Sequence, residues 1–208
     1  MKIGIIGATG KAGRNILKEA LIRGHDVTAI VRNASKLTEN VPVLEKDALA
    51  LTDADLTPFD VVVNAFGSLD NVSLHVELGN RLTEALQGSD TRLIVVGGAG
   101  SLFVGPDKKV RVVDTPDFPD FIKPLANAQG ENLRMLQGTA GLKWTFVSPS
   151  AEFALGQRTG AYQSGQDHLL VNSQGRSYVS YEDYAIAVLD EIEQPKHIGE
   201  RFTVVSEG

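Results

Sequence analysis

The sequence contains no cysteine among its 208 residues. That absence excludes thiol catalysis, cysteine-ligated zinc, iron–sulfur clusters and disulfide scaffolds. An excess of positive charge is also missing, because 20 Lys+Arg stand against 26 Asp+Glu and the formal net charge is −6. Nucleic acids and anionic membrane surfaces attract basic proteins, so we expect this chain to bind neither.

Long apolar runs are absent as well. The stretch that begins at Met1 reaches Gly7 too early for a signal-peptide core, and no segment approaches the roughly 20 apolar residues that span a bilayer. Together with the missing cysteine, this favours a cytoplasmic location. The four histidines show no metal-ligand spacing, so no metal site is predicted, and His75 is interpreted as a structural histidine within a helix.

The chain does contain an alternation of apolar, strand-like runs with segments of helical period. Strands are predicted at 2–6, 27–31, 42–44, 61–63, 93–96 and 143–147, and an edge strand at 201–205. Strands that are apolar on both faces and separated by helices indicate an α/β fold with a doubly wound, mostly parallel, Rossmann-like sheet. We expect residues 1–208 to form a single domain of this kind, as a monomer or a weak homodimer.

Two long irregular segments follow the fifth and sixth predicted strands. Residues 97–124 contain four of the eight prolines, which excludes one long helix, and residues 149–167 are irregular too. Both segments leave the carboxyl edge of the sheet, where ligands of open α/β folds bind. Loops of this length in a compact domain are usually functional.

A glycine-rich turn stands between the first strand and the first helix. In this context a glycine triplet predicts a dinucleotide site, because small residues let the backbone approach a pyrophosphate that the helix start attracts. We assign to cofactor binding Gly7, Thr9, Gly10, Lys11, Ala12 and Gly13. A packing turn without ligand is the alternative. A nucleotide-triphosphate loop fits less well, since Ala12 replaces the Ser or Thr that would follow the lysine.

The choice between NAD and NADP is usually made at the end of the second strand, where an acidic residue favours NAD. Here Arg32 takes that place and Lys36 follows. Charge-assisted hydrogen bonds from a guanidinium to the 2′-phosphate, each of about 1.5 to 3 kcal/mol, would favour NADP(H) over NAD(H) by roughly tenfold or more. The alternative is that Arg32 is a solvated surface arginine.

Further motifs carry a family resemblance. The turn, Arg32, Asp47-Ala48 and Asn64-Ala65-Phe66-Gly67 resemble the NAD(P)-binding half of atypical short-chain dehydrogenases. Residues 95–101, 113–119 and 144–149 are similar to small bacterial proteins described as NADH-flavin reductases, relatives of the flavin and biliverdin reductases. The resemblance implies that Asp47 and Ala48 flank the adenine and that Asn64, Ala65, Phe66 and Gly67 line the adenosine ribose and pyrophosphate. The backbone at Ser148 and Pro149 would then approach the nicotinamide.

The catalytic pair of the main short-chain dehydrogenases, a Tyr followed four residues later by Lys, is missing. The residues at that spacing after Tyr162, Tyr178, Tyr181 and Tyr184 are Gln166, Glu182, Ala185 and Val188. Ketone reduction, alcohol oxidation and sugar epimerisation through that acid are therefore disfavoured. Flavin reduction needs no such acid, since the charge on the reduced ring is delocalised and the protein has mainly to hold the two rings together.

The predicted function is therefore hydride transfer from NADPH to a small-molecule acceptor. The resemblance favours a free flavin (FMN, FAD or riboflavin) as substrate rather than as a bound prosthetic group. Candidate catalytic residues are Ser101 and Lys123, with a loop-capping serine and a solvent-exposed lysine as the alternatives. A non-catalytic NADP(H) sensor and a quinone or tetrapyrrole reductase remain open.

Overall fold

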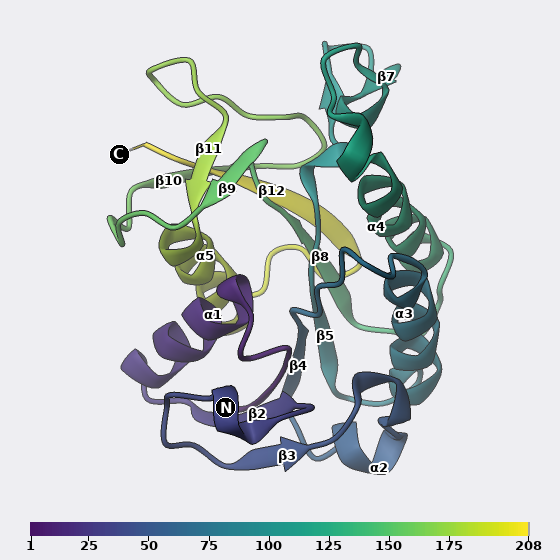
Figure 1. Cartoon of the computed structure of the whole chain (residues 1–208), viewed down its shortest axis with the longest axis vertical. Coiled ribbons are helices and arrows are strands. Elements are labelled where there is room, and N and C mark those ends of the chain that lie inside the picture. Colours follow the sequence, from purple (N-terminus) through teal and green to yellow (C-terminus); the bar gives the residue numbers. More distant parts are fainter. Residues whose placement is uncertain (208) are drawn as a thin grey trace.

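The apolar runs of the sequence become strands of one sheet. In the computed structural model, which describes residues 1–207, eight strands hydrogen-bond in the order β10-β12-β8-β5-β4-β1-β2-β3 (Figure 1). Their bounds are β1 Lys2–Ile6, β2 Asp26–Val31, β3 Val43–Glu45, β4 Val61–Asn64, β5 Arg92–Val96, β8 Trp144–Ser148, β10 Tyr162–Gly165 and β12 Glu200–Ser206. Every neighbouring pair is parallel except β10 with β12. The predicted Rossmann-like sheet is confirmed.

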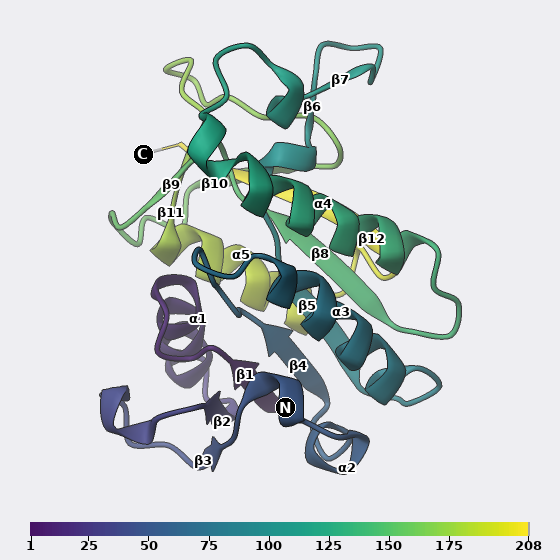
Figure 2. The same cartoon turned by 45° about the vertical axis from the view of Figure 1, so that its right-hand side comes forward.

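Helices cover both faces of this sheet, as an amphipathic helix must against a sheet that is apolar on both sides. Their bounds are α1 Lys11–Ile22, α2 Asp53–Leu56, α3 Ser73–Leu86, α4 Lys123–Gln137 and α5 Tyr181–Glu193. Figures 1 and 2 show α1 and α5 together on one face, and α3 and α4 on the other. Two buried apolar clusters result, one with Ile16 and Val188, the other with Leu82 and Leu136.

Both long loops carry short elements of their own. The loop after β5 forms the 3-10 turn η3 (Ala99–Ser101) and a hairpin of β6 (Phe103–Val104) with β7 (Val110–Arg111), then the turns η4 (Val112–Asp114) and η5 (Asp120–Ile122). The loop after β8 contains β9 (Glu152–Ala154), which pairs with β11 (Tyr178–Ser180). Ser180 caps α5, because its side chain accepts a hydrogen bond from the Asp183 N–H.

One prediction about the sheet is wrong. The strand predicted at 201–205 is not an edge strand, because β12 lies between β8 and β10. β10 takes the edge and pairs antiparallel to β12, with Tyr162 opposite Ser206. The sequence of β10, Tyr-Gln-Ser-Gly, has little apolar content, so no periodicity indicated a strand there.

Candidate cofactor and acceptor site

The strand order reverses beside β1, since β1 lies between β2 and β4, and the glycine turn follows β1 directly. Gly7 has a φ of +75°, and a Cβ there would lie 2.6 Å from the Ala65 carbonyl oxygen. A Cβ at Gly13 would lie 2.3 Å from the Gly7 oxygen, whereas one at Gly10 would meet only that oxygen, at 3.2 Å. Gly7 and Gly13 therefore close the turn, and Gly10 leaves the backbone accessible.

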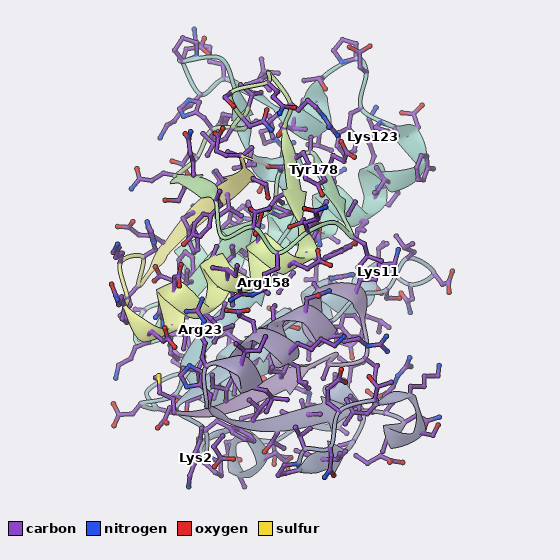
Figure 3. All side chains as sticks on the ribbon, turned by 90° about the vertical axis from the view of Figure 1, so that its left-hand side faces the viewer. Lys2, Lys11, Arg23, Lys123, Arg158 and Tyr178 are labelled. Carbon is purple, nitrogen blue, oxygen red and sulfur yellow. The ribbon has the colours of Figure 1, made fainter. Side chains whose placement is uncertain are left out.

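The N-terminus of α1 is open to a ligand. The helix begins at Lys11 with no side-chain cap and no acidic residue in its first turn. The backbone N–H groups of Lys11, Ala12 and Gly13 find no acceptor in residues 1–207. Such a helix start carries partial positive charge and free donors, so it fits the pyrophosphate of a dinucleotide. Figure 3 shows Lys11 at this end of α1.

The loop after β4 faces the same turn. Asn64 is buried, and its Oδ1 accepts a hydrogen bond from the Phe66 N–H at 3.1 Å. The Phe66 ring packs edge-on against His75, with ring centroids 5.3 Å apart. Gly67 is exposed, and nothing lies within 4 Å of where its Cβ would be. The side chains of Asn64 and Phe66 thus shape the loop, while Ala65 and Gly67 leave room for a ligand.

His75 has the structural role expected of it. Its Nε2 lies 3.2 Å from both the backbone nitrogen and the oxygen of Ser68. Burial lowers the pKa of His75, although the hydrogen bond with Ser68 works against that shift. A neutral, hydrogen-bonded imidazole here fixes the loop after β4. No group of His, Cys, Asp or Glu side chains between residues 1 and 207 could hold a metal ion.

Three cations lie on α1 and on the loop after β2, and a contact joins these two segments. Arg32 and Lys36 are exposed, and neither has an ion-pair partner in the described part of the chain. Arg14, in α1, was not singled out from the sequence. Its Nη2 lies 3.4 Å from the carbonyl oxygens of both Thr9 and Lys36, and its Nε is buried without a partner. A cation near a helix N-terminus is electrostatically unfavourable, and that was the signal available in the sequence.

The remaining candidate residues for cofactor binding differ in solvent exposure. Asp47 is exposed, and its Oδ1 accepts a hydrogen bond from the Leu49 N–H at 2.9 Å, whereas Ala48 is buried. Ser148 is fully buried and Pro149 is buried beside it. In this structure the accessible surface after β8 therefore begins at Ala151, and neither Ser148 nor Pro149 is open to a nicotinamide.

The three glycines after β5 serve packing. A Cβ at Gly97 would lie 2.0 Å from the Phe146 ring, and one at Gly98 would lie 2.1 Å from Gln129 Oε1. At Gly100 a Cβ would approach that of Ala126 to 2.7 Å. Distances this short exclude any side chain without movement, so these glycines let α4 and Phe146 pack directly against the end of β5.

The two candidate catalytic residues are bonded to different partners. Ser101 is half-buried at the end of η3, and its Oγ accepts a hydrogen bond from Arg201 at 3.0 Å. Lys123 begins α4, and its Nζ lies 2.8 Å from the Asp120 carboxylate. In the part of the molecule that is described, no hydrogen bond joins Ser101 to Lys123. Each therefore has its own partner.

None of the four tyrosines is prepared as an acid. Burial raises the pKa of Tyr184, which donates a hydrogen bond to the Val147 oxygen, and of Tyr162, which donates to Asp190. Burial also raises the pKa values of Tyr178 and Tyr181. The Tyr-Lys mechanism needs a phenol of lowered pKa, and the structure provides the opposite environment.

A cavity of about 280 Å³ lies away from the glycine turn, between the end of α5 and β10. Both carboxylates in its lining are already bonded. Glu191 binds Arg92 and His197, and Asp190 accepts from Arg23 and Tyr162. The cavity therefore presents no free acid, and the glycine turn remains the candidate site.

Comparison with known proteins agrees with this assignment. A family model described as NAD(P)H-binding matches residues 7–195. The uncharacterised protein YwnB of Bacillus subtilis is 60% identical over 211 residues, which cover 100% of this chain and 99% of that protein.

Two solved structures are similar over nearly their whole length. A Streptococcus pneumoniae protein provisionally named an NADH-flavin reductase is 43% identical, with a TM-score of 0.94 and 99% of each chain covered. A Bacteroides thetaiotaomicron protein provisionally named an epimerase is 37% identical, with a TM-score of 0.86, and the match covers 100% of this chain and 97% of that one. With the turn, the open helix start and these matches together, the chain belongs to the NAD(P)H-binding family.

Proposed function

We propose that the protein is a reductase that uses NADPH to reduce a free flavin or a similar planar acceptor. The observation that carries the proposal is the open start of α1 together with Arg14, Arg32 and Lys36, which have no carboxylate partner within residues 1–207, in a chain of net charge −6. An acidic protein that keeps local positive charge unpaired is suited to a small anionic ligand rather than to a polyanion.

The preference for NADPH rests on Arg14, Arg32 and Lys36. The guanidinium of Arg14 bridges the glycine turn and the loop after β2 through the Thr9 and Lys36 oxygens. Arg32 precedes Lys36 in that same loop, so these three cations are the ones that would receive a 2′-phosphate. Several cations around one phosphate give charge-assisted bonds that the ribose hydroxyl of NADH cannot form.

The acceptor is inferred from the chemistry that the chain lacks. When bound, NADPH would supply a hydride, and Gly10 with the start of α1 would hold its pyrophosphate. A ketone substrate needs an acid to protonate the new alkoxide, and the tyrosine pKa values offer none. A flavin spreads the added charge over its ring system, so a hydrogen-bond donor and solvent suffice. The provisional name of the Streptococcus pneumoniae neighbour agrees with this acceptor class.

The test is steady-state oxidation of NADPH with FMN, FAD, riboflavin and quinones in turn, compared with NADH under the same conditions. We expect acceptor-dependent turnover that is fastest with a flavin, and a lower KM for NADPH than for NADH. Tight binding of NADPH without turnover on any acceptor would contradict the reductase and favour a cofactor-sensing protein. Turnover confined to quinones would retain the reductase but replace the acceptor.

A further inference from the structure

A buried arginine lies directly behind the candidate residue Ser101. Arg201 belongs to β12, and only 3% of its side chain is exposed. Its Nη1 donates hydrogen bonds to both the Oγ and the main-chain oxygen of Ser101, each at 3.0 Å. Both bonds of Arg201 Nη1 thus go to a single serine.

The other edge of the guanidinium is held by a carboxylate. Arg201 Nε and Nη2 donate to Asp167 Oδ1 at 3.1 and 2.7 Å, and Lys108 on the β6–β7 hairpin donates to Asp167 Oδ2 at 2.7 Å. Burial opposes ionisation of Asp167, but the bonds from Lys108 and Arg201 outweigh it and lower the pKa of that carboxyl group. Because it is hydrogen-bonded along both edges, the guanidinium has little freedom to rotate.

Backbone bonds fix the same segments to each other. Phe103 N–H donates to the Asp167 oxygen at 2.8 Å, and Leu169 N–H donates to the Phe103 oxygen at 3.0 Å. The chain after η3 and the loop after β10 are therefore joined without the Ser101 hydroxyl, and the Arg201–Asp167 pair already ties the start of β12 to that loop. The bond from Arg201 to that hydroxyl needs a reason other than holding the loops together.

The hydroxyl keeps its own hydrogen available. Ser101 Oγ acts as an acceptor toward Arg201, and throughout residues 1–207 it donates to no acceptor. Ser101 is half-buried rather than enclosed, and it follows directly from the glycines at the carboxyl end of β5. A hydroxyl that accepts a charge-assisted bond becomes a stronger donor, because the two bonds polarise one another.

We propose that Arg201, fixed by Asp167, is a positioning residue that aims the Ser101 hydroxyl hydrogen at the hydride acceptor. The inference rests on the proposed reductase function. In the reaction the acceptor gains a hydride, and with it the two electrons that the cofactor loses, and negative charge appears on its conjugated heteroatoms. The Ser101 hydroxyl donates a hydrogen bond to that charge, and water supplies the one proton that completes the reduction.

The experiment compares Ser101→Ala, Arg201→Lys and the double variant. The first readout is the Kd of riboflavin for the protein saturated with NADP, from quenching of flavin fluorescence, and the second is kcat with NADPH. A charge-assisted hydrogen bond corresponds to a change of about tenfold, which we expect in kcat for each single variant, because the acceptor becomes charged only during the reaction. The Kd of the uncharged riboflavin should rise in the same variants by less than that, with the KM for NADPH unchanged. Because both substitutions remove the same bond, the loss in the double variant should be no greater than the larger of the two single-variant losses.

Arg134→Lys is the matched control, since Arg134 is paired with Glu131 on the exposed side of α4, and it should leave both readouts unchanged. Losses that multiply in the double variant, or a Ser101→Ala protein that binds and reduces riboflavin like wild type, would overturn the positioning role. If wild type binds riboflavin but turns over no acceptor, the reductase is refuted, but the riboflavin affinities still decide the role of Ser101. If wild type neither binds a flavin nor turns over any acceptor, both proposals fall.

Discussion

The half of the molecule up to β5 and the half that follows it present opposite kinds of surface at the carboxyl edge. In the first half the backbone is open, with N–H groups at α1 and cations at Arg14, Arg32 and Lys36 that find no partner among residues 1–207. In the second half the polar side chains are bonded to one another, as in the Lys108–Asp167–Arg201–Ser101 series. The first half thus offers unpaired donors to an anionic ligand, whereas the polar groups of the second half already form a hydrogen-bonded network, which we call the bonded frame.

This contrast follows from what each half has to recognise. A pyrophosphate is met by backbone donors and positive potential, which require glycine and an uncapped helix. A neutral planar acceptor offers few charges, so the protein can select it only through a small number of fixed groups. Changes to the first half should therefore act on cofactor binding, and changes to the second on stability or on the acceptor.

The largest effect is expected from Gly13→Val, which attacks the backbone of the first half. The new Cβ would lie 2.3 Å from the Gly7 oxygen, so the turn cannot keep its shape. We expect the free energy of unfolding to fall by about 4 kcal/mol or more and NADPH binding to be lost. Urea unfolding and fluorescence titration with NADPH measure the two effects. Gly138→Ala is the control, because its Cβ would have ordinary contacts of 3.6 to 3.8 Å; equal losses there would contradict the special role of Gly13.

Glu191→Gln tests the bonded frame of the second half. Glu191 is buried and is hydrogen-bonded by Arg92 and His197, and the substitution leaves the Arg92 guanidinium without its buried counter-charge. Breaking one partner of such a pair costs about 3 to 5 kcal/mol, which urea unfolding at pH 7 should show, with NADPH affinity unchanged. A large loss of NADPH affinity in the folded variant would contradict the separation of the two halves.

The same carboxylate predicts a dependence on pH. Burial works against ionisation of Glu191, but the bonds from His197 and Arg92 prevail and lower its pKa from the ordinary value of 4.5. A lowered folded-state pKa means that the stabilisation is complete above the unfolded value and is lost as the pH falls through the folded one. Unfolding free energies of wild type should therefore decline below about pH 4.5, more steeply than those of Glu191→Gln. Parallel curves for the two proteins would contradict the assignment.

Arg32→Asp should change cofactor choice rather than stability. The substitution replaces a cation by a carboxylate that repels the 2′-phosphate and can bind the ribose hydroxyl of NADH. We expect the Kd for NADPH to rise by roughly tenfold or more while that for NADH changes little. Lys143→Asp, which reverses a surface charge paired with Asp90, is the control. Equal losses of NADPH and NADH binding would refute the selective role of Arg32.

The smallest effect is expected from Thr203→Val, in the interior of the second half. Thr203 and its neighbour in the sheet register, Ser148, are fully buried, and neither hydroxyl has a hydrogen-bond partner within the described chain. Removing an unpaired buried hydroxyl while keeping the shape should be neutral or stabilise the protein by about 1 kcal/mol. Thermal unfolding measures this. A clear loss of stability would indicate an internal water between the two hydroxyls, as found for many buried polar groups.

The sequence was most informative where apolar periodicity determines structure. β1 was predicted with its observed bounds, and β2, β4 and β5 to within one residue, because short β-branched apolar runs such as Val61 to Val63 favour buried strands. The elements β9, β10 and β11 were missed, since they contain polar residues and form only by pairing with segments elsewhere in the chain. Pairing of that kind leaves no periodic signal.

The candidate site divides in the same way. The glycine turn could be predicted because its glycines meet local requirements of the backbone, such as the positive φ of Gly7. Arg201 could not be predicted, and Arg14 could be suspected only as a cation near a helix N-terminus, since the contacts of both depend on segments that approach from residues 36 and 101. The burial of Ser148 was equally hidden from the sequence, because it depends on how the segments around β8 pack.

The place of β12 in the sheet has a consequence for the order of events during synthesis. The five strands of the first half are complete once residue 96 has emerged, and they can pair with one another early. Within residues 1–207, by contrast, β10 pairs only with β12, so it remains unpaired until residues 200–206 insert between it and β8. During synthesis, the proposed nucleotide-binding surface should therefore form well before the bonded frame that includes Arg201. The late-folding half, with its unpaired strand edges, is then the part of the chain that a chaperone would bind.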